Sequence, residues 1–455
     1  MSAEADPLVS IQFVFAECKR MQARLLSGEK VMPNSPEAME FFYKIPHPEV
    51  SWSFLVCGRA ADQGLQDLAR RAALHAGISH QVSNAVIRDK LAEVIVRKFL
   101  KEKRPLDRKN VDRALSEAAK LAARGRETIT HYVPCHLMVA QKPDQFDIGP
   151  VHFRTQRSFR AHLAPIVSTA RVGLRRSGKF ISRALRYYRS FSWVAEVTVS
   201  GCDRPTSKEV AARAVAAALD CLHLLLEPRY TYKMSIGGPD LSRDWRGSLS
   251  VSDSEGLGYS IGYTGAGSVS FEEDWWQRFE HESYARALHL CGIALESVVD
   301  PSFERPLSRR FLDAALWFGE AVRERSLAAK VVKYATALER MVMTDEQDDI
   351  TSLMSGRIAA ICCENPDDSF DSWQRDAQRL YALRSRLVHG SISPHSNAFV
   401  DGIALGAKLG EATLLQTLLA FGEVGLKEEK VGQKRLANWF NRIVSHVSEA
   451  RGKAP

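Results

Sequence analysis

Apolar residues recur every three or four positions over much of this chain, the spacing that gathers them on one face of a helix. Between residues 61 and 125, three consecutive segments show this pattern and predict three amphipathic helices. Asp107 stands where the third helix would have its N-cap, and Gly125 where that helix would end. Residues 1–58 contain short apolar runs without a clear period, so no element is assigned to them.

The hydrophobic period shortens in the middle of the chain. Segments 128–140 and 192–200 resemble strands, and the glycine-punctuated run 247–271 alternates apolar with small residues, as strands joined by hairpin turns do. Segment 207–227, which lies between these strands, has a helical pattern. The middle of the chain is therefore predicted to be mixed α+β.

From about residue 273 the pattern is helical to the end of the chain. Helices are expected at roughly 273–299, 307–324, 326–343, 349–363, 370–389, 399–424 and 429–450. The predicted fold class is α+β: a mixed N-terminal and middle region at 1–300, with a possible sub-boundary near 125–150, and then an all-α helical bundle at 301–455. A chain of 455 residues has room for such domains.

Two features of the sequence argue against export and membrane insertion. The first ten residues lack the basic start and apolar run of a signal peptide. The most apolar segment, 211–227, is interrupted by Asp220 and His223 and is shorter than the roughly 20 apolar residues that a membrane span needs. We expect a cytoplasmic protein that does not enter a membrane.

The eight cysteines are scattered, and no two form a CxxC pair, which favours reduced, buried thiols over a zinc site or a disulfide framework. His131, Cys135 and His136 lie close together in the sequence. On a strand, however, His136 would face away from the other two, so a structural role is expected. No metal and no cofactor is predicted.

The positive charge is concentrated in one window. The chain carries 62 Lys and Arg against 54 Asp and Glu, and no acidic residue lies between Asp147 and Glu196. Ten of the 62 basic residues lie in this window, so the rest of the chain is close to neutral. The ten are Arg154, Arg157, Arg160, Arg171, Arg175, Arg176, Lys179, Arg183, Arg186 and Arg189.

Aromatic residues, among them Phe159, Tyr187 and Tyr188, alternate with these arginines. Guanidinium groups for phosphate and rings for stacked bases suit a single-stranded nucleic acid. The nucleic-acid contacts expected on this basis are Arg171, Arg175, Arg176, Lys179, Arg183, Arg186 and Arg189. A solvated basic face above core aromatics explains the same pattern, and both interpretations remain open.

The segment RLYALRSRLVHGSISPHS, 379–396, combines two arginines with a histidine where a predicted helix stops at a glycine. The spacing Arg-x4-His alone is uninformative, because the chain contains it four times. At Arg384 and His389 it is accompanied by Tyr381, by Ser385 and by Gly390. An Arg and a His at a helix end also serve simply to cap carbonyl groups and to oppose the helix dipole.

With the helical blocks before it, this segment resembles the HEPN superfamily, and among its members the Apea-like HEPN domains. The resemblance covers about the last 130–150 residues and includes the Ala-Leu-Glu triplet that ends at Glu339. It implies a metal-independent endoribonuclease that leaves a 2′,3′-cyclic phosphate, with His389 as acid/base group and Arg384 as phosphate clamp. Such domains are common in toxin and anti-phage defence systems, so a defence role is the matching expectation.

The residue chemistry agrees with these roles. Among side chains only histidine titrates near neutral pH without perturbation, and a guanidinium fork matches the charge that develops on phosphate. Ser385 would hold a phosphate oxygen or orient the imidazole. Glu339, Tyr381 and Arg386 are possible supporting residues, although a salt-bridged surface role fits Glu339 equally well.

One histidine per chain cannot easily serve as both base and acid in one step. The family resemblance implies that two chains face their motifs across one cleft, so a homodimer with RNA as its substrate is expected. The alternative function is a non-catalytic nucleic-acid-binding or scaffolding protein in which the HEPN-like helices mediate dimerisation.

Overall fold

The chain forms two compact units in a computed structural model. Unit 1 comprises residues 1–129 and 199–209, and unit 2 comprises residues 130–198 and 210–455. The structure describes residues 6–27, 43–50, 52–140, 142–173, 182, 185–237, 244–252, 256–264, 274–344, 349–363 and 370–452.

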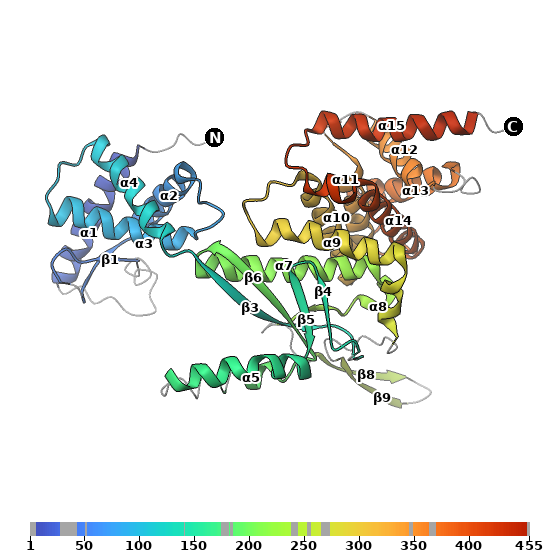
Figure 1. Cartoon of the computed structure of the whole chain (residues 1–455), viewed down its shortest axis with the longest axis horizontal. Helices are drawn as coiled ribbons and strands as arrows, with labels where there is room; N and C mark the ends of the chain where they lie inside the picture. The colour runs from blue at the N-terminus through green and yellow to red at the C-terminus, as the bar shows by residue number, and fades with distance from the viewer. Residues whose placement is uncertain are drawn as a thin grey trace. The chain divides into compact units, whose positions relative to one another are not determined.

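Unit 1 is mainly helical and has its own apolar core, built from one face of each helix. The three helices expected between residues 61 and 125 are confirmed, and the Asp107 carboxylate accepts a hydrogen bond from the N–H of Asn110 at 2.8 Å, as an N-cap does. A helix and two antiparallel strands occupy the segment in which no period was visible (Figure 1). The elements are α1 (Pro7–Leu26), β1 (Tyr43–Pro46), β2 (Phe54–Cys57), α2 (Arg59–Ala76), α3 (Asn84–Ile95), the π-helical continuation Val96–Lys101 and α4 (Arg108–Ala123).

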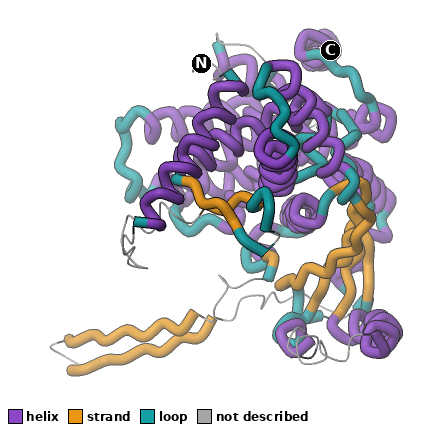
Figure 2. Tube along the Cα trace, turned by 90° about the vertical axis from the view of Figure 1, so that its left-hand side faces the viewer, coloured by secondary structure: helices purple, strands orange, loops and turns teal. Residues whose placement is uncertain are grey.

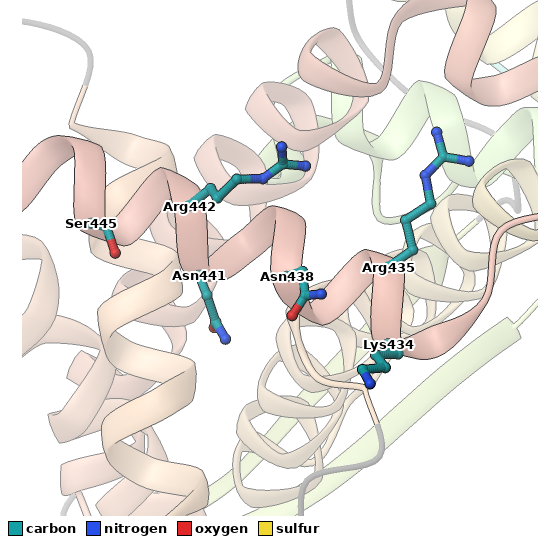
Figure 3. A pocket seen from close by; sticks show the side chains of 6 residues that line it. All are labelled: Lys434, Arg435, Asn438, Asn441, Arg442 and Ser445. Carbon is teal, nitrogen blue, oxygen red and sulfur yellow. The ribbon is translucent and has the colours of Figure 1, made fainter.

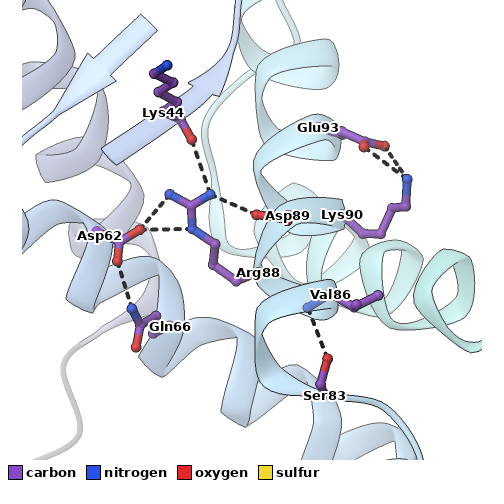
Figure 4. Close-up of polar contacts among 9 residues, drawn as sticks. All are labelled: Lys44, Asp62, Gln66, Ser83, Val86, Arg88, Asp89, Lys90 and Glu93. Atoms are coloured by element: carbon purple, nitrogen blue, oxygen red, sulfur yellow. Dashed lines mark hydrogen bonds and ion pairs between the residues drawn. The ribbon is translucent and has the colours of Figure 1, made fainter. Parts of the chain in front are cut away.

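A buried ion pair ties α2, α3 and β1 together in unit 1 (Figure 4). The Arg88 guanidinium donates to the Asp62 carboxylate, with Nε 2.9 Å from Oδ1, and to the carbonyl of Lys44 at 3.1 Å. Gln66 donates to the other Asp62 oxygen at 2.7 Å. Asp62 is buried, and each of its carboxylate oxygens therefore accepts a hydrogen bond.

The middle region contains a five-stranded sheet in the order β4-β5-β6-β3-β7 and a separate two-stranded hairpin, seen as a long ribbon in Figure 2. The predicted strands at 128–140 and 192–200 and the helix at 207–227 are confirmed. Within the predicted run 247–271, two strands are confirmed up to residue 264, and residues 253–255 and 265–271 lie outside the described residues. The elements β4, β5, α5, α8 and β7 were not predicted. The elements are β3 (Glu127–His136), β4 (Gln145–Ile148), β5 (Val151–Thr155), α5 (Gln156–Gly173), β6 (Trp193–Cys202), α7 (Arg204–Leu225), α8 (Pro228–Thr231), β7 (Ser235–Ile236), β8 (Asp244–Ser252) and β9 (Gly256–Thr264).

The C-terminal region is helical throughout its described residues, as predicted. It differs at its start, where a 3-10 helix, Trp275–Glu280, precedes α9 in place of one continuous helix, and within the predicted helix 399–424, where Gly422 has a non-helical φ of 60° and marks a kink. The helices are α9 (Glu282–Val299), α10 (Pro306–Arg323), α11 (Leu327–Val342), α12 (Ile350–Cys362), α13 (Phe370–Val388), α14 (Ala398–Lys427) and α15 (Gln433–Gly452).

Helix α14 packs against five other helices of this region, α9 to α13, and a stripe of glycines makes this possible. Gly402, Gly406 and Gly410 are spaced by four residues and therefore lie on one face. A Cβ atom at Gly406 would lie 2.8 Å from the buried ring of Tyr334, and one at Gly410 would lie 2.8 Å from the ring of Phe318. Only hydrogen fits there, so α10 and α11 approach α14 closely.

The fold is thus a mixed α+β N-terminal and middle region with antiparallel sheets, followed by an all-helical region from α9 to α15. Helix α9 already packs against α10 and α14, so the helical region begins at Glu282 or before. A separate domain that starts at residue 301 stays a prediction.

Candidate active site

His389 lies at the end of α13, where a left-handed glycine stops the helix. Gly390 has φ of 70°, and its N–H donates to the carbonyl of Leu387 at 3.0 Å. The N–H of Ser391 donates to the carbonyl of Arg386 at 2.7 Å. These two bonds form a Schellman motif, which satisfies the last carbonyls of the helix. The imidazole of His389, next to this stop, is exposed.

One turn before the end of α13, Arg384 contacts two groups that hold its guanidinium. The carboxylate of Glu339, on α11, lies 3.6 Å from Nη2 of Arg384. The Arg384 guanidinium also lies over the ring of Tyr381, 5.5 Å from its centroid, and the Tyr381 hydroxyl is hydrogen-bonded to Glu339. Two helices therefore bring Arg384, Tyr381 and Glu339 into one cluster, which we call the Arg384 cluster.

The Arg384 cluster is partly removed from water. Burial raises the pKa of the Glu339 carboxyl, although the charge of Arg384 and the hydroxyl of Tyr381 oppose this shift. Burial also raises the pKa of the Tyr381 hydroxyl, and the Glu339 charge adds to that effect. Nε of Arg384 is buried and has no hydrogen-bond acceptor among the described residues, so one donor of the guanidinium is left unused.

The other two predicted residues lie beside this cluster. Ser385 is half-buried, and its carbonyl accepts a hydrogen bond from the N–H of His389 at 3.0 Å. Arg386 is exposed. Within the described part of the chain, no hydrogen bond or ion pair joins the Arg384 side chain to that of His389. The structure thus unites Arg384, Tyr381 and Glu339 and leaves the imidazole separate, at the exposed helix end.

The predicted nucleic-acid contacts are described only in part. Arg171 lies on α5, but its side chain is outside the described residues, as are Arg175, Arg176, Lys179 and Arg183 altogether. Arg186 and Arg189, at a short helix over 185–188, are exposed. The seven residues therefore form no single demonstrated surface.

Helix α15 carries a further basic surface, which the sequence analysis did not single out. Lys434, Arg435, Asn438, Asn441, Arg442 and Ser445 line a hollow of about 790 Å³. Figure 3 shows Arg435 and Arg442 on one side of the helix. The sequence could have indicated this surface, because Arg435 and Arg442 are seven residues apart and that spacing places two side chains on one helical face.

The surroundings of the cysteines and of the segment around His131 suit a structural role. Seven of the eight cysteines are buried, and all are free thiols. His131, Cys135 and His136 lie on β3, and burial raises the pKa of Cys135 to about 12, so this thiol is not activated. Among the described residues, no group of three or more His, Cys, Asp or Glu side chains is placed to hold a metal ion.

Comparison with known proteins gives no relative. No family model, no curated protein and no solved structure matches the chain. Separately, none of the helices in the described ranges is both long and apolar enough to cross a membrane.

Proposed function

We propose that this protein is a metal-independent endoribonuclease that cuts RNA with His389 and Arg384. The observation that carries this proposal is the exposed imidazole of His389 at the end of the helix whose last turns also hold Arg384, the guanidinium that contacts Glu339 and Tyr381. A histidine that only caps the helix does not require the Arg384 cluster on the same helix. The resemblance of α11 to α13 to HEPN domains supports the same function, and a role in defence against phage follows as part of this proposal.

In the proposed reaction, the ribose 2′-hydroxyl oxygen forms a bond to the adjacent phosphorus, and the bond from phosphorus to the 5′ oxygen breaks. One His389 takes the proton of the 2′-hydroxyl, and a second His389, from another copy of the chain, gives a proton to the leaving 5′ oxygen. Arg384 opposes the negative charge of the pentacoordinate phosphate. The products are a 2′,3′-cyclic phosphate and a 5′-hydroxyl.

The first test is replacement of the imidazole. His389→Ala should lower the rate of RNA cleavage by roughly 10²–10⁴-fold, the usual contribution of a general acid/base group, without unfolding the protein. The matched control is His395→Ala, which removes another exposed imidazole six residues further along the chain. Cleavage of a mixture of transfer, ribosomal and unstructured RNA is followed on denaturing gels, and mass spectrometry identifies the cyclic phosphate.

Three results would decide against the proposal. The first is a wild-type chain that leaves every RNA in the mixture intact, and the second is cleavage at equal rates by His389→Ala and His395→Ala. The third is a set of products with a 5′-phosphate, because the proposed reaction breaks the bond on the other side of the phosphorus.

The second candidate is a non-catalytic nucleic-acid-binding protein. It is favoured by the exposed arginines of the basic window, Arg157, Arg160, Arg186 and Arg189, which lie in a stretch of sequence without acidic residues. This function predicts that His389→Ala changes little, whereas Arg186→Ala with Arg189→Ala abolishes RNA binding. A gel-shift measurement on both variants separates the two functions.

A further inference from the structure

A pocket of about 300 Å³ lies between α5 and the short helix at 185–188. This volume is at the small end of the range for ligand sites, about 300–1,000 Å³, and is suited to a single small ring system. The pocket is lined by Gln156, Phe159, Arg160, Leu163, Ala164, Val167, Ser168, Leu185, Tyr188 and Arg189.

The lining of this pocket combines apolar with polar surface, and part of the apolar surface is aromatic. Leu163 and Leu185 contribute aliphatic surface, and the ring of Tyr188 packs against that of Phe159 with centroids 5.2 Å apart. The Tyr188 hydroxyl donates to the carbonyl of Tyr132 at 2.6 Å, which fixes the ring. A fixed ring between aliphatic groups is a surface on which a flat aromatic molecule stacks without ordering the protein further.

Two arginines that line the pocket form no ion pair with a described residue. Arg160 and Arg189 are both exposed, and no ion pair joins either guanidinium to another described residue. The nearest carboxylate after them in sequence, Glu196, is already paired with Arg154 at 2.9 Å and with His162 at 3.3 Å. No acidic residue lines the pocket, so its rim favours an anion.

We propose that this pocket binds one nucleotide unit, with the base against Tyr188 and the phosphate between Arg160 and Arg189. An apolar slot beside two guanidinium groups matches a molecule with a flat ring and an anionic group a few ångströms away. The unit is either a free nucleotide or one residue of a single strand. This inference does not rest on the cleavage proposal, because it concerns binding alone.

The test uses the full chain with His389→Ala, so that bound RNA is not cut. Binding of a labelled ten-nucleotide RNA is measured by fluorescence anisotropy at several salt concentrations, and binding of adenosine monophosphate by calorimetry. Arg160→Ala with Arg189→Ala should weaken binding by roughly tenfold or more. It should also reduce the salt slope by about 0.7 for each phosphate that the protein no longer neutralises.

Two further variants separate this pocket from diffuse positive charge. Ala164→Trp fills the pocket from an exposed position and keeps both arginines, so it should also weaken binding by roughly tenfold. Arg157→Ala is the control, because it removes one positive charge from α5, the helix that holds Arg160, and Arg157 does not line the pocket. It should weaken binding less than about threefold.

The outcomes are distinct. Binding of the mononucleotide with this pattern of variants identifies a free nucleotide as ligand, and binding of the RNA alone identifies a strand; both support the pocket. Equal effects of Arg157→Ala and of the arginine double variant would overturn it, as would a normal affinity in Ala164→Trp. Failure of both the RNA and adenosine monophosphate to bind would also overturn it. Loss of binding here leaves the His389 cleavage test unaffected.

Discussion

Gly390 decides where the imidazole of His389 stands. In an unbroken helix, residues five apart lie about 140° from each other, so Arg384 and His389 would face different directions. The left-handed conformation of Gly390 ends α13 at Val388 and places His389 at the helix end rather than along its side. No atom lies within 4 Å of a Cβ built at Gly390, so an added methyl group would cause backbone strain and no collision.

We therefore expect Gly390→Ala to destabilise the protein by about 1 kcal/mol, because alanine is strained in the left-handed conformation. The variant should also cleave RNA more slowly, because α13 would no longer end at the same residue. The control is Gly64→Ala, inside α2, where the space is also open but the conformation is helical. That variant should be stabilised by up to about 1 kcal/mol. Urea denaturation measures the free energy of unfolding of both variants. A change of the same sign in both would contradict the explanation.

Two helices of unit 2 are joined by a buried carboxylate. Asp220 of α7 is 1% exposed, and Nη1 of Arg323, at the end of α10, lies 2.8 Å from its Oδ1. Burial raises the pKa of Asp220 to about 7, and the charge of Glu320 adds to this, although Arg323 opposes both. Its other oxygen, Oδ2, has no hydrogen-bond partner among the described residues. The ion pair is therefore incompletely satisfied.

This pKa predicts how stability depends on pH. Between pH 4 and pH 7 the folded state holds a proton on Asp220 that the unfolded state, with its usual pKa of 3.8, has released. Stability should therefore fall as pH rises through this range, by up to about 4 kcal/mol from this group. Asp220→Asn does not titrate, so the wild type should lose stability relative to this variant from pH 5 to pH 8. Urea denaturation at both values checks this, and a constant difference would show that Arg323 keeps the carboxylate ionised.

At the scale of the whole molecule, the proposed chemistry requires two chains. Each chain supplies one exposed His389 and one Arg384 cluster, and the reaction needs a base and an acid in the same step. If both imidazoles serve one phosphate, the site exists only in a dimer, and activity becomes a property of the assembly.

A mixing experiment tests this requirement. An excess of His389→Ala, allowed to exchange subunits with the wild type, should suppress wild-type cleavage, because a mixed dimer holds one imidazole where the reaction needs two. Light scattering after size-exclusion chromatography reports the dimer. A strictly monomeric chain that still cleaves RNA would refute the composite site, whatever the variants do.

The helices of the C-terminal region were predictable because they depend on neighbours in sequence. The helices from α10 to α15 match the predicted segments closely, since apolar period, caps and breakers act within one or two turns. The end of α13 was predictable for the same reason, from one glycine after one histidine. Strands β4 and β5 were missed because four or five residues carry too little periodicity.

The sequence by itself determined the fold class, the helices of the C-terminal region and the place where α13 ends, because each follows from short-range hydrogen bonding and hydrophobic period. Only the tertiary structure decided which side chains meet across elements. The contact of Glu339 with Arg384, the burial that raises the pKa of Asp220, and the pocket between α5 and residues 185–188 all join separate elements. Such contacts depend on packing summed over the whole chain, and no local pattern encodes that sum.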